Sequence, residues 1–225
     1  MDKFIKRSVS LSGESNEEEK ESMKKKPKIV HRKYDEREAL MRKSMPDVLL
    51  RVLQEIIKIV NYIKSRPLNS RIFNALCHEM GADHQSLLFH TQVRWLSRGK
   101  VLSRIYELEN ETEMFLQSQG SDYEHLFKKE EWLAKLAYLT DIFAHLNELN
   151  RKMKGRNSNI LTSSDKIESF RAKLELWISL ATNGNNEMFP NVIAADIEQK
   201  VQALIVKHLK LLAEKMNFYF PKRDL

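Results

Sequence analysis

The sequence has 225 residues, which is enough for one sizeable domain or two small ones. Hydrophobic residues make up 42% and charged residues 31%, a balance typical of a soluble, helix-rich protein. No apolar run reaches transmembrane length, and the N-terminus lacks the apolar core of a signal peptide, so we expect no membrane contact. A net charge of +7 favours acidic partners, nucleic acid first, although a basic surface without any partner is an equally open interpretation.

The single cysteine, Cys77, excludes an internal disulfide and indicates a reducing compartment. It lies on the apolar side of a helical pattern, so we predict a buried core residue. Together with the charge, this favours a nuclear protein, with the cytoplasm as the alternative.

Residues 1–44 are predicted to form a disordered, charged tail. Residues 8–22 are rich in Ser and Glu and hold too few apolar side chains to offset their chain entropy. A basic cluster follows, and it is typical either of a nuclear-import signal or of an arm that contacts phosphates. A solubilising run of charge is the alternative. The cluster consists of Lys24, Lys25, Lys26, Lys28, Arg32 and Lys33.

Apolar residues at helical spacing predict helices along most of the remaining chain. The first begins at Pro46 and ends before Pro67, and the second begins at Asn69 or Ser70 and ends at Gly81. A third helix runs from Arg98 to about residue 120. Residues 157–164 are predicted to be a loop. Further helices are predicted over residues 126–149, from residue 165 to about residue 180, and over 192–216.

Residues 86–95 are the one plausible strand. Leu87, Phe89 and Val93 would share one face, although Leu88 breaks the alternation and β-branched residues are few.

The sequence offers no recognisable catalytic or metal site. Cys77, His78, His84 and His90 do not have the spacing of a zinc site. No aspartate ends a convincing strand, as a carboxylate-metal nuclease would require. A glycine-rich phosphate loop and a nucleophile motif are also absent from the sequence. From the residues alone we expect no enzyme activity, no cofactor and no metal.

Residues 90–100 contain a tryptophan flanked by cationic residues, and an apolar run precedes it. Trp95 is flanked by Arg94, Arg98 and Lys100, and no acidic residue occurs between Asp83 and Glu107. A tryptophan ring can stack on an unpaired base while neighbouring cations hold the phosphates. The alternative is that Trp95 is a core anchor and the cations are solvated, since large aromatic residues dominate protein cores.

Residues 94–102, Arg-Trp-Leu-Ser-Arg-Gly-Lys-Val-Leu, resemble the hAT transposase superfamily. Residues 60–71, residues 76–81 and the opening Met-Asp-Lys-Phe are also similar to it, most of all to its Buster-like branch of zinc-finger BED-type proteins. The resemblance implies an RNase H-like core interrupted by a helical insertion domain. It also implies that Arg94 and Trp95 match an Arg-Trp motif that holds flipped or hairpin DNA.

The sequence departs from this family where catalysis would require a match. Lys33 and Glu36 stand where the resemblance implies a cysteine and a histidine, and the cysteines of a BED finger are missing. The regions that would carry the two catalytic aspartates and the final glutamate have no counterpart. We therefore expect an internally deleted, C-terminally truncated derivative. Its expected parts are the tail, 1–44, a residual RNase H-like region with helices and one possible strand, 45–97, and an insertion-domain-like helical region, 98–225.

The sequence thus predicts a mainly α-helical, transposase-derived nuclear protein without catalysis. Weak, salt-dependent DNA binding through Arg94, Trp95, Arg98 and Lys100 is the predicted activity, together with protein contacts or homo-oligomers through helical faces. A helical interaction module, or a non-functional product, without any role on nucleic acid is the first alternative. A retained transposase or nuclease is the second.

Overall fold

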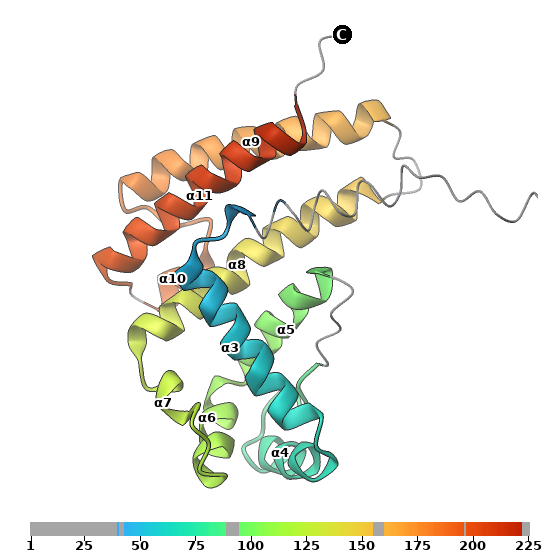
Figure 1. Cartoon of the computed structure of the whole chain (residues 1–225), viewed down its shortest axis with the longest axis vertical. Helices are drawn as coiled ribbons and strands as arrows, with labels where there is room; N and C mark the ends of the chain where they lie inside the picture. The colour runs from blue at the N-terminus through green and yellow to red at the C-terminus, as the bar shows by residue number, and fades with distance from the viewer. Residues whose placement is uncertain (1–39, 41–42, 89–94, 155–159, 196, 222–225) are drawn as a thin grey trace, which may run out of the picture. The chain divides into compact units, whose positions relative to one another are not determined.

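The computed structural model describes residue 40 and residues 43–88, 95–154, 160–195 and 197–221, with the backbone alone for 95–97 and 160–162. All of them belong to the unit Glu38–Leu225, whereas the unit Met1–Arg37 lies outside the described residues. The regular elements of the described ranges are helices, so the predicted mainly α-helical fold is confirmed (Figure 1).

The chain alternates long helices with short ones. Their bounds are α3 (Asp47–Lys64), α4 (Pro67–Glu79), α5 (Trp95–Glu107), α6 (Glu109–Ser118), α7 (Glu124–Phe127), α8 (Glu130–Met153), α9 (Ile160–Thr182), α10 (Pro190–Ala194) and α11 (Gln199–Tyr219). None of these helices is long and apolar enough to cross a membrane.

Helix α8 is the centre of the fold. It contacts α3, α5, α7, α9, α10 and α11, and Figure 1 shows α9 and α11 lying side by side along it. Consecutive residues of α8 are fully buried, including Tyr138, Leu139, Ile142 and Phe143. A helix that is apolar on several faces has to be covered on several faces, which explains why neighbours surround α8.

Polar side chains of α8 fix two of these contacts. Tyr138 Oη lies 2.8 Å from Nδ1 of the fully buried His208 of α11. The carboxylate of Asp141 accepts hydrogen bonds from the backbone amides of Asn191 and Val192, at 3.0 and 3.1 Å. These amides lie in the first turn of α10, where a helix has no acceptors of its own. Burial raises the pKa of the Asp141 carboxyl, while the hydrogen bonds act in the opposite direction.

The structure confirms the first two predicted helices and shifts the start of the second. Helix α3 ends before Pro67, as predicted, and Pro67 is itself the first residue of α4. The first position of a helix suits a residue without an amide hydrogen. Asn69 lies inside α4 and donates from Nδ2 to the Tyr62 carbonyl at 3.1 Å. Gly81 follows α4 with a φ of 71°, as the predicted terminator requires.

Four of the later predictions were wrong in their boundaries. The helix predicted over residues 126–149 is divided into α7 and α8, with Lys128 and Lys129 between them. The helix predicted from Arg98 to about residue 120 is divided at Leu108, whose backbone leaves helical geometry while its side chain is buried. The helix predicted to begin at Asp165 begins at Ile160, so residues 160–164 are not a loop. The last predicted helix is divided into α10 and α11. Apolar periodicity continues across such breaks because both pieces bury the same side.

The predicted strand over residues 86–95 is not found in the described part of that segment. Residues 86–88 have no regular structure, and Trp95 already belongs to α5; residues 89–94 lie outside the described ranges. Leu87 is nevertheless buried. A strand needs a partner for its backbone groups, and the described chain offers it no other strand. At Leu87, the apolar residue of this pattern that the structure describes as buried, burial occurs without strand pairing.

Candidate nucleic-acid interface

The predicted binding residues lie at the start of α5, as far as the structure describes them. Trp95 is the first residue of this helix. The structure describes its backbone but not its side chain, and Arg94 lies outside the described residues. Arg98 is half-buried and Lys100 is exposed. Whether Trp95 is a base platform or a core anchor therefore stays a prediction. The tail cluster, from Lys24 to Lys33, lies outside the described residues.

The chain on both sides of residues 89–94 is held to α5. Arg104 donates from Nη1 to the carbonyl of Ser86 at 3.0 Å, and its Nε lies 3.3 Å from the Glu107 carboxylate. His84 Nδ1 lies 3.2 Å from the same carboxylate. Burial of Leu87 adds an apolar anchor. Ser86 is thus held to the helix that begins at Trp95.

The start of α5 is electrostatically positive. The first turn of this 13-residue helix contains no acidic residue, and its amides form the positive end of the helix dipole. Glu107, the first acidic residue after Asp83, lies at the other end of the helix and already contacts Arg104 and His84. A phosphate approaching the start of α5 would therefore meet cations and amides without a nearby carboxylate from this helix.

Gly99 gives this helix its close approach to α8. A Cβ placed on Gly99 would lie 2.2 Å from Asn147 Nδ2 and 3.4 Å from Phe143 Cβ. Only a residue without a side chain fits this distance unless Asn147 moves. Gly99, which lies within the segment predicted to contact DNA, thus has a role in helix packing. Its place in the sequence does not reveal this role.

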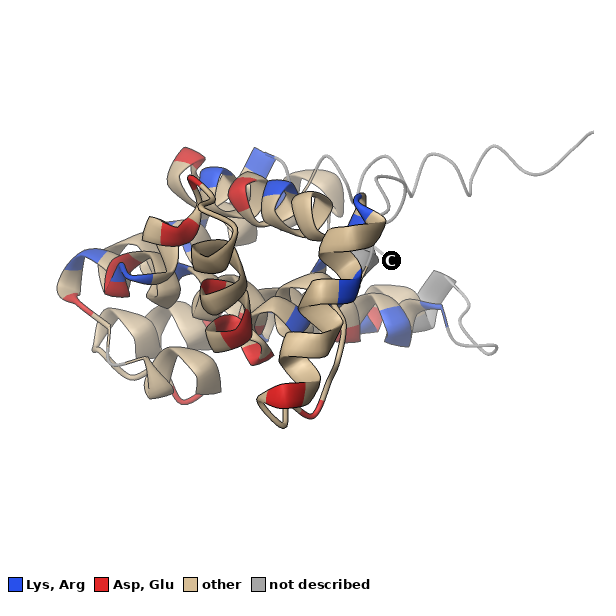
Figure 2. Cartoon of the chain, turned by 90° about the horizontal axis from the view of Figure 1, so that it is seen from below, with Lys and Arg blue, Asp and Glu red and all other residues tan. Residues whose placement is uncertain are grey.

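Beyond this segment, charge is mixed over the helices. Figure 2 shows Lys and Arg interspersed with Asp and Glu along the chain in that view. Several of these charges pair within one helix, such as Lys128 with Glu124 and Lys135 with Glu131. The net positive charge of the chain therefore does not by itself mark a binding face among the described residues.

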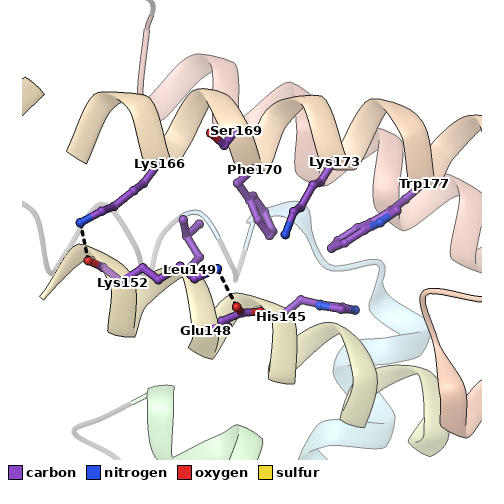
Figure 3. A pocket seen from close by; sticks show the side chains of 9 residues that line it. All are labelled: His145, Glu148, Leu149, Lys152, Lys166, Ser169, Phe170, Lys173 and Trp177. Carbon is purple, nitrogen blue, oxygen red and sulfur yellow. Dashed lines mark hydrogen bonds and ion pairs between the residues drawn. The ribbon is translucent and has the colours of Figure 1, made fainter. Parts of the chain in front are cut away.

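A basic cavity between α8 and α9 was missed by the sequence analysis. It has a volume of about 200 Å³ and is lined by lysines from both helices and by Phe170 and Trp177 of α9 (Figure 3). The signal that could have revealed it is the spacing of Lys166, Phe170, Lys173 and Trp177. This spacing places alternating cations and aromatic rings on one helical face.

The residues considered for metal binding or thiol chemistry do not form a site in the described ranges. Cys77 is fully buried, as predicted, and this burial raises the pKa of its thiol to about 11. A thiol in that state is a poor nucleophile and a poor metal ligand. Within the described residues, no three His, Cys, Asp or Glu side chains are grouped closely enough to hold an ion.

The comparisons with known proteins bear on the origin of this helical fold. No solved structure matches the chain. Residues 31–181 match the family model of the FAM200/GTF2IRD2 helical domain, and this range includes the start of α5 and most of α9. Because the match covers about two thirds of the chain, the protein belongs to the FAM200/GTF2IRD2-like family of helical domains, which derives from hAT-like transposases.

Proposed function

We propose that this transposase-derived protein binds nucleic acid weakly, through phosphate contacts at the start of α5, and has no catalytic activity. The proposal includes a nuclear location, with the basic cluster Lys24–Lys33 as import signal, and descent from a Buster-like ancestor. It also includes the origin of residues 45–97 in an RNase H-like core and of residues 98–225 in an insertion domain. Family membership supports the ancestry in general and leaves these particulars as proposals.

One observation carries the binding proposal: the first turn of α5 contains no acidic residue, and half-buried Arg98 and exposed Lys100 lie in its first two turns. Helix amides and cationic side chains act on the same phosphate, and such contacts are the main source of sequence-independent affinity. The Gly99 contact holds α5 firmly against α8, so these groups would be presented on a rigid element.

Salt dependence and charge reversal together test the proposal. Binding of fluorescent single- and double-stranded DNA, measured by anisotropy, should weaken steeply between about 50 and about 200 mM salt. Lys100→Glu should weaken binding to every sequence and make the slope of log affinity against log salt shallower by about one or more. The matched control is Lys207→Glu, an exposed lysine of α11, which should bind as the parent does.

Two outcomes would count against the proposal. An absence of binding at the lowest salt concentration would remove the nucleic-acid role. Cleavage of DNA by the pure protein with Mg²⁺ or Mn²⁺ would contradict the absence of catalysis and favour a retained nuclease.

An exposed apolar stripe on α4 favours a second candidate function, self-association. Leu68 is 62% exposed and Ile72, one turn later, is 38% exposed. Arg66 and Arg71 lie at the start of this helix region, and Glu79 and Asp83 lie at its end. Two copies of α4 packed antiparallel about a two-fold axis would therefore bring opposite charges together beside the apolar stripe.

Light scattering after size exclusion separates this function from the first one. A dimer that forms without DNA and is lost in Ile72→Lys, while the circular-dichroism melt is unchanged, would support self-association through α4. A monomer at all concentrations would exclude it without affecting the DNA-binding proposal.

A further inference from the structure

The cavity between α8 and α9 has an apolar floor built from rings that are held in place. Phe170 and Trp177 are 6% and 7% exposed, and their ring centroids lie 5.8 Å apart in an edge-to-face arrangement. The ring of His145 lies 4.5 Å from that of Trp177, and its Nε2 lies 2.8 Å from the Met188 carbonyl. Since a carbonyl can only accept, Nε2 is the donor, and this bond fixes the orientation of the ring. Leu149 of α8 completes the floor.

The rim of the cavity is cationic. Lys152 forms an ion pair with Glu148 at 2.6 Å, and Lys166 donates to the Lys152 carbonyl at 2.7 Å. Figure 3 shows Lys173 reaching from α9 between Phe170 and Trp177 toward α8. Within the described part of the chain, its ammonium group has no hydrogen bond or ion pair. Lys152 and Lys173 therefore both act on the Glu148 carboxylate, while Lys166 lies beside the Lys152 carbonyl.

The carboxylate of Glu148 stays ionised in this setting. A hydrogen bond from Lys152 lowers its pKa, burial acts in the opposite direction, and the nearby charges of Lys152 and Lys173 lower the pKa further. The rim thus holds an excess of positive charge for a ligand anion. It also holds one acceptor for a ligand hydrogen-bond donor.

We propose that this cavity binds one nucleoside monophosphate unit, with the base against the part of the aromatic floor that the cavity leaves open and the phosphate on Lys173 and its neighbouring lysines. Base stacking on aromatic side chains combined with cations for the phosphate is the general mode by which proteins hold unpaired nucleotides. The volume of about 200 Å³ is below that of most drug-sized sites, so it suits a single base, with the sugar and phosphate at the open rim. The site is independent of the start of α5, and a free nucleotide would occupy it whether or not α5 contacts DNA.

The composition of the rim favours a nucleotide over the other aromatic anion common in cells, phosphotyrosine. The ring of phosphotyrosine has no hydrogen-bond donor for the Glu148 carboxylate. A nucleotide has donors on the amino groups of its base and on the hydroxyls of its sugar. A purely acidic peptide would leave the aromatic floor unused.

Calorimetric titration of the full chain with adenosine monophosphate, inorganic phosphate and phosphotyrosine tests this site. Adenosine monophosphate should bind at least about tenfold more tightly than inorganic phosphate, because only the nucleotide has a base that can contact the aromatic floor. A short oligoadenylate, titrated in the same way, distinguishes free nucleotide from nucleic acid as the source of the unit. Tighter binding of the oligoadenylate that is lost in Lys173→Glu assigns the site to nucleic acid, and equal or weaker binding assigns it to the free nucleotide.

Two variants separate rim and floor. Lys173→Glu changes an exposed residue, so it should leave the circular-dichroism melt unchanged while weakening the binding of adenosine monophosphate by about tenfold or more. Phe170→Leu keeps the floor apolar but removes a ring, and should reduce the preference for the nucleotide over inorganic phosphate. Lys207→Glu on α11 is the matched control and should bind adenosine monophosphate as the parent does.

Three results would overturn the proposal: no binding of adenosine monophosphate at millimolar concentration, equal affinity for inorganic phosphate, or tighter binding of phosphotyrosine. An unchanged affinity in Lys173→Glu would also do so, since that ammonium is the cation most open to the ligand. None of these results bears on the DNA contacts of α5, because the mononucleotide titration does not use them.

Discussion

The two sides of helix α8 differ in how closely their neighbours approach. On one side α5 comes so near that a Cβ on Gly99 would overlap Asn147. On the other side α9 faces α8 through lysines and aromatic rings, and a cavity of about 200 Å³ remains. The difference shows that the residue at the crossing sets the spacing of two helices. A glycine permits a dry contact, whereas long charged side chains keep their ends in water and leave space beneath them.

The contact between α8 and α11 differs from both the α5–α8 and the α8–α9 contacts. It excludes water, yet it contains a titratable group. His208 is fully buried against Tyr138, and burial lowers the pKa of its imidazole to about 4. This contact tolerates only the neutral ring. The rim of the cavity, by comparison, carries full charges at little cost because water reaches them.

The largest expected effect is a pH dependence that arises from His208. In the unfolded chain its pKa returns to about 6.5, so below that pH the unfolded state binds a proton that the folded state does not. The free energy of unfolding should therefore fall as the pH drops from about 6.5 toward about 4, by about 3 kcal/mol from this residue alone. Urea melts at a series of pH values measure it.

The variant His208→Gln is the control for that experiment. An amide can still form a hydrogen bond with Tyr138 Oη but does not titrate, so the variant should lose less stability than the parent between these pH values. Parallel curves for the two proteins would show that other groups cause the acid sensitivity.

The next effect tests the close contact of α5. Gly99→Leu should lower the free energy of unfolding by about 2 kcal/mol, because the side chain would overlap Asn147 and Phe143. In a chain of this size that corresponds to a decrease in Tm of about 4 to 8 °C. Differential scanning calorimetry gives the value directly.

Two neighbouring variants show whether the overlap is the cause. Gly99→Ala should have a much smaller effect, since the end of the Asn147 side chain can move and alanine favours the helix by about 1 kcal/mol. Lys100→Leu, one residue later and exposed, should have little effect on stability. If it destabilised the protein as much as Gly99→Leu did, the close crossing would not be the explanation.

The smallest effect is expected on the open side of α8. Lys173→Met removes one of three like charges from the rim and leaves an apolar side chain above the aromatic floor. We expect the free energy of unfolding to change by no more than about 0.5 kcal/mol, as is usual for exposed positions. A loss above about 1 kcal/mol in a thermal melt would show that Lys173 holds the two helices together.

Much of the helical content was predictable because burial imposes a period on the sequence. The recurring apolar residues of α3, from Leu49 to Ile63, predicted this helix correctly, and Gly81 marked the end of α4. The same periodicity did not reveal the break at Leu108 or the start of α9 at Ile160. A break costs little when both pieces bury the same face, so the apolar pattern passes through it unchanged.

The candidate site was predictable only in part, for a related reason. The cationic character of residues 94–100 is a property of local sequence, and the resemblance to hAT transposases rests on local motifs. The role of Gly99 depends on Asn147 and Phe143, which lie more than forty residues away along the chain. The strand predicted for residues 86–95 was wrong in its described part because strand formation depends on a partner that the local pattern cannot supply.

Local sequence was therefore sufficient for the helical class, the burial of Cys77 and the family resemblance, since each depends on residues within a few turns of one another. Tertiary structure alone decided which sides of α8 are dry and which is open. It brought Lys152 and Lys173 to one rim, His145 and Trp177 to one floor, and Gly99 into contact with Asn147. The physical reason is that packing between helices depends on the shapes of side chains far apart in sequence, and periodicity records only which side of each helix is covered.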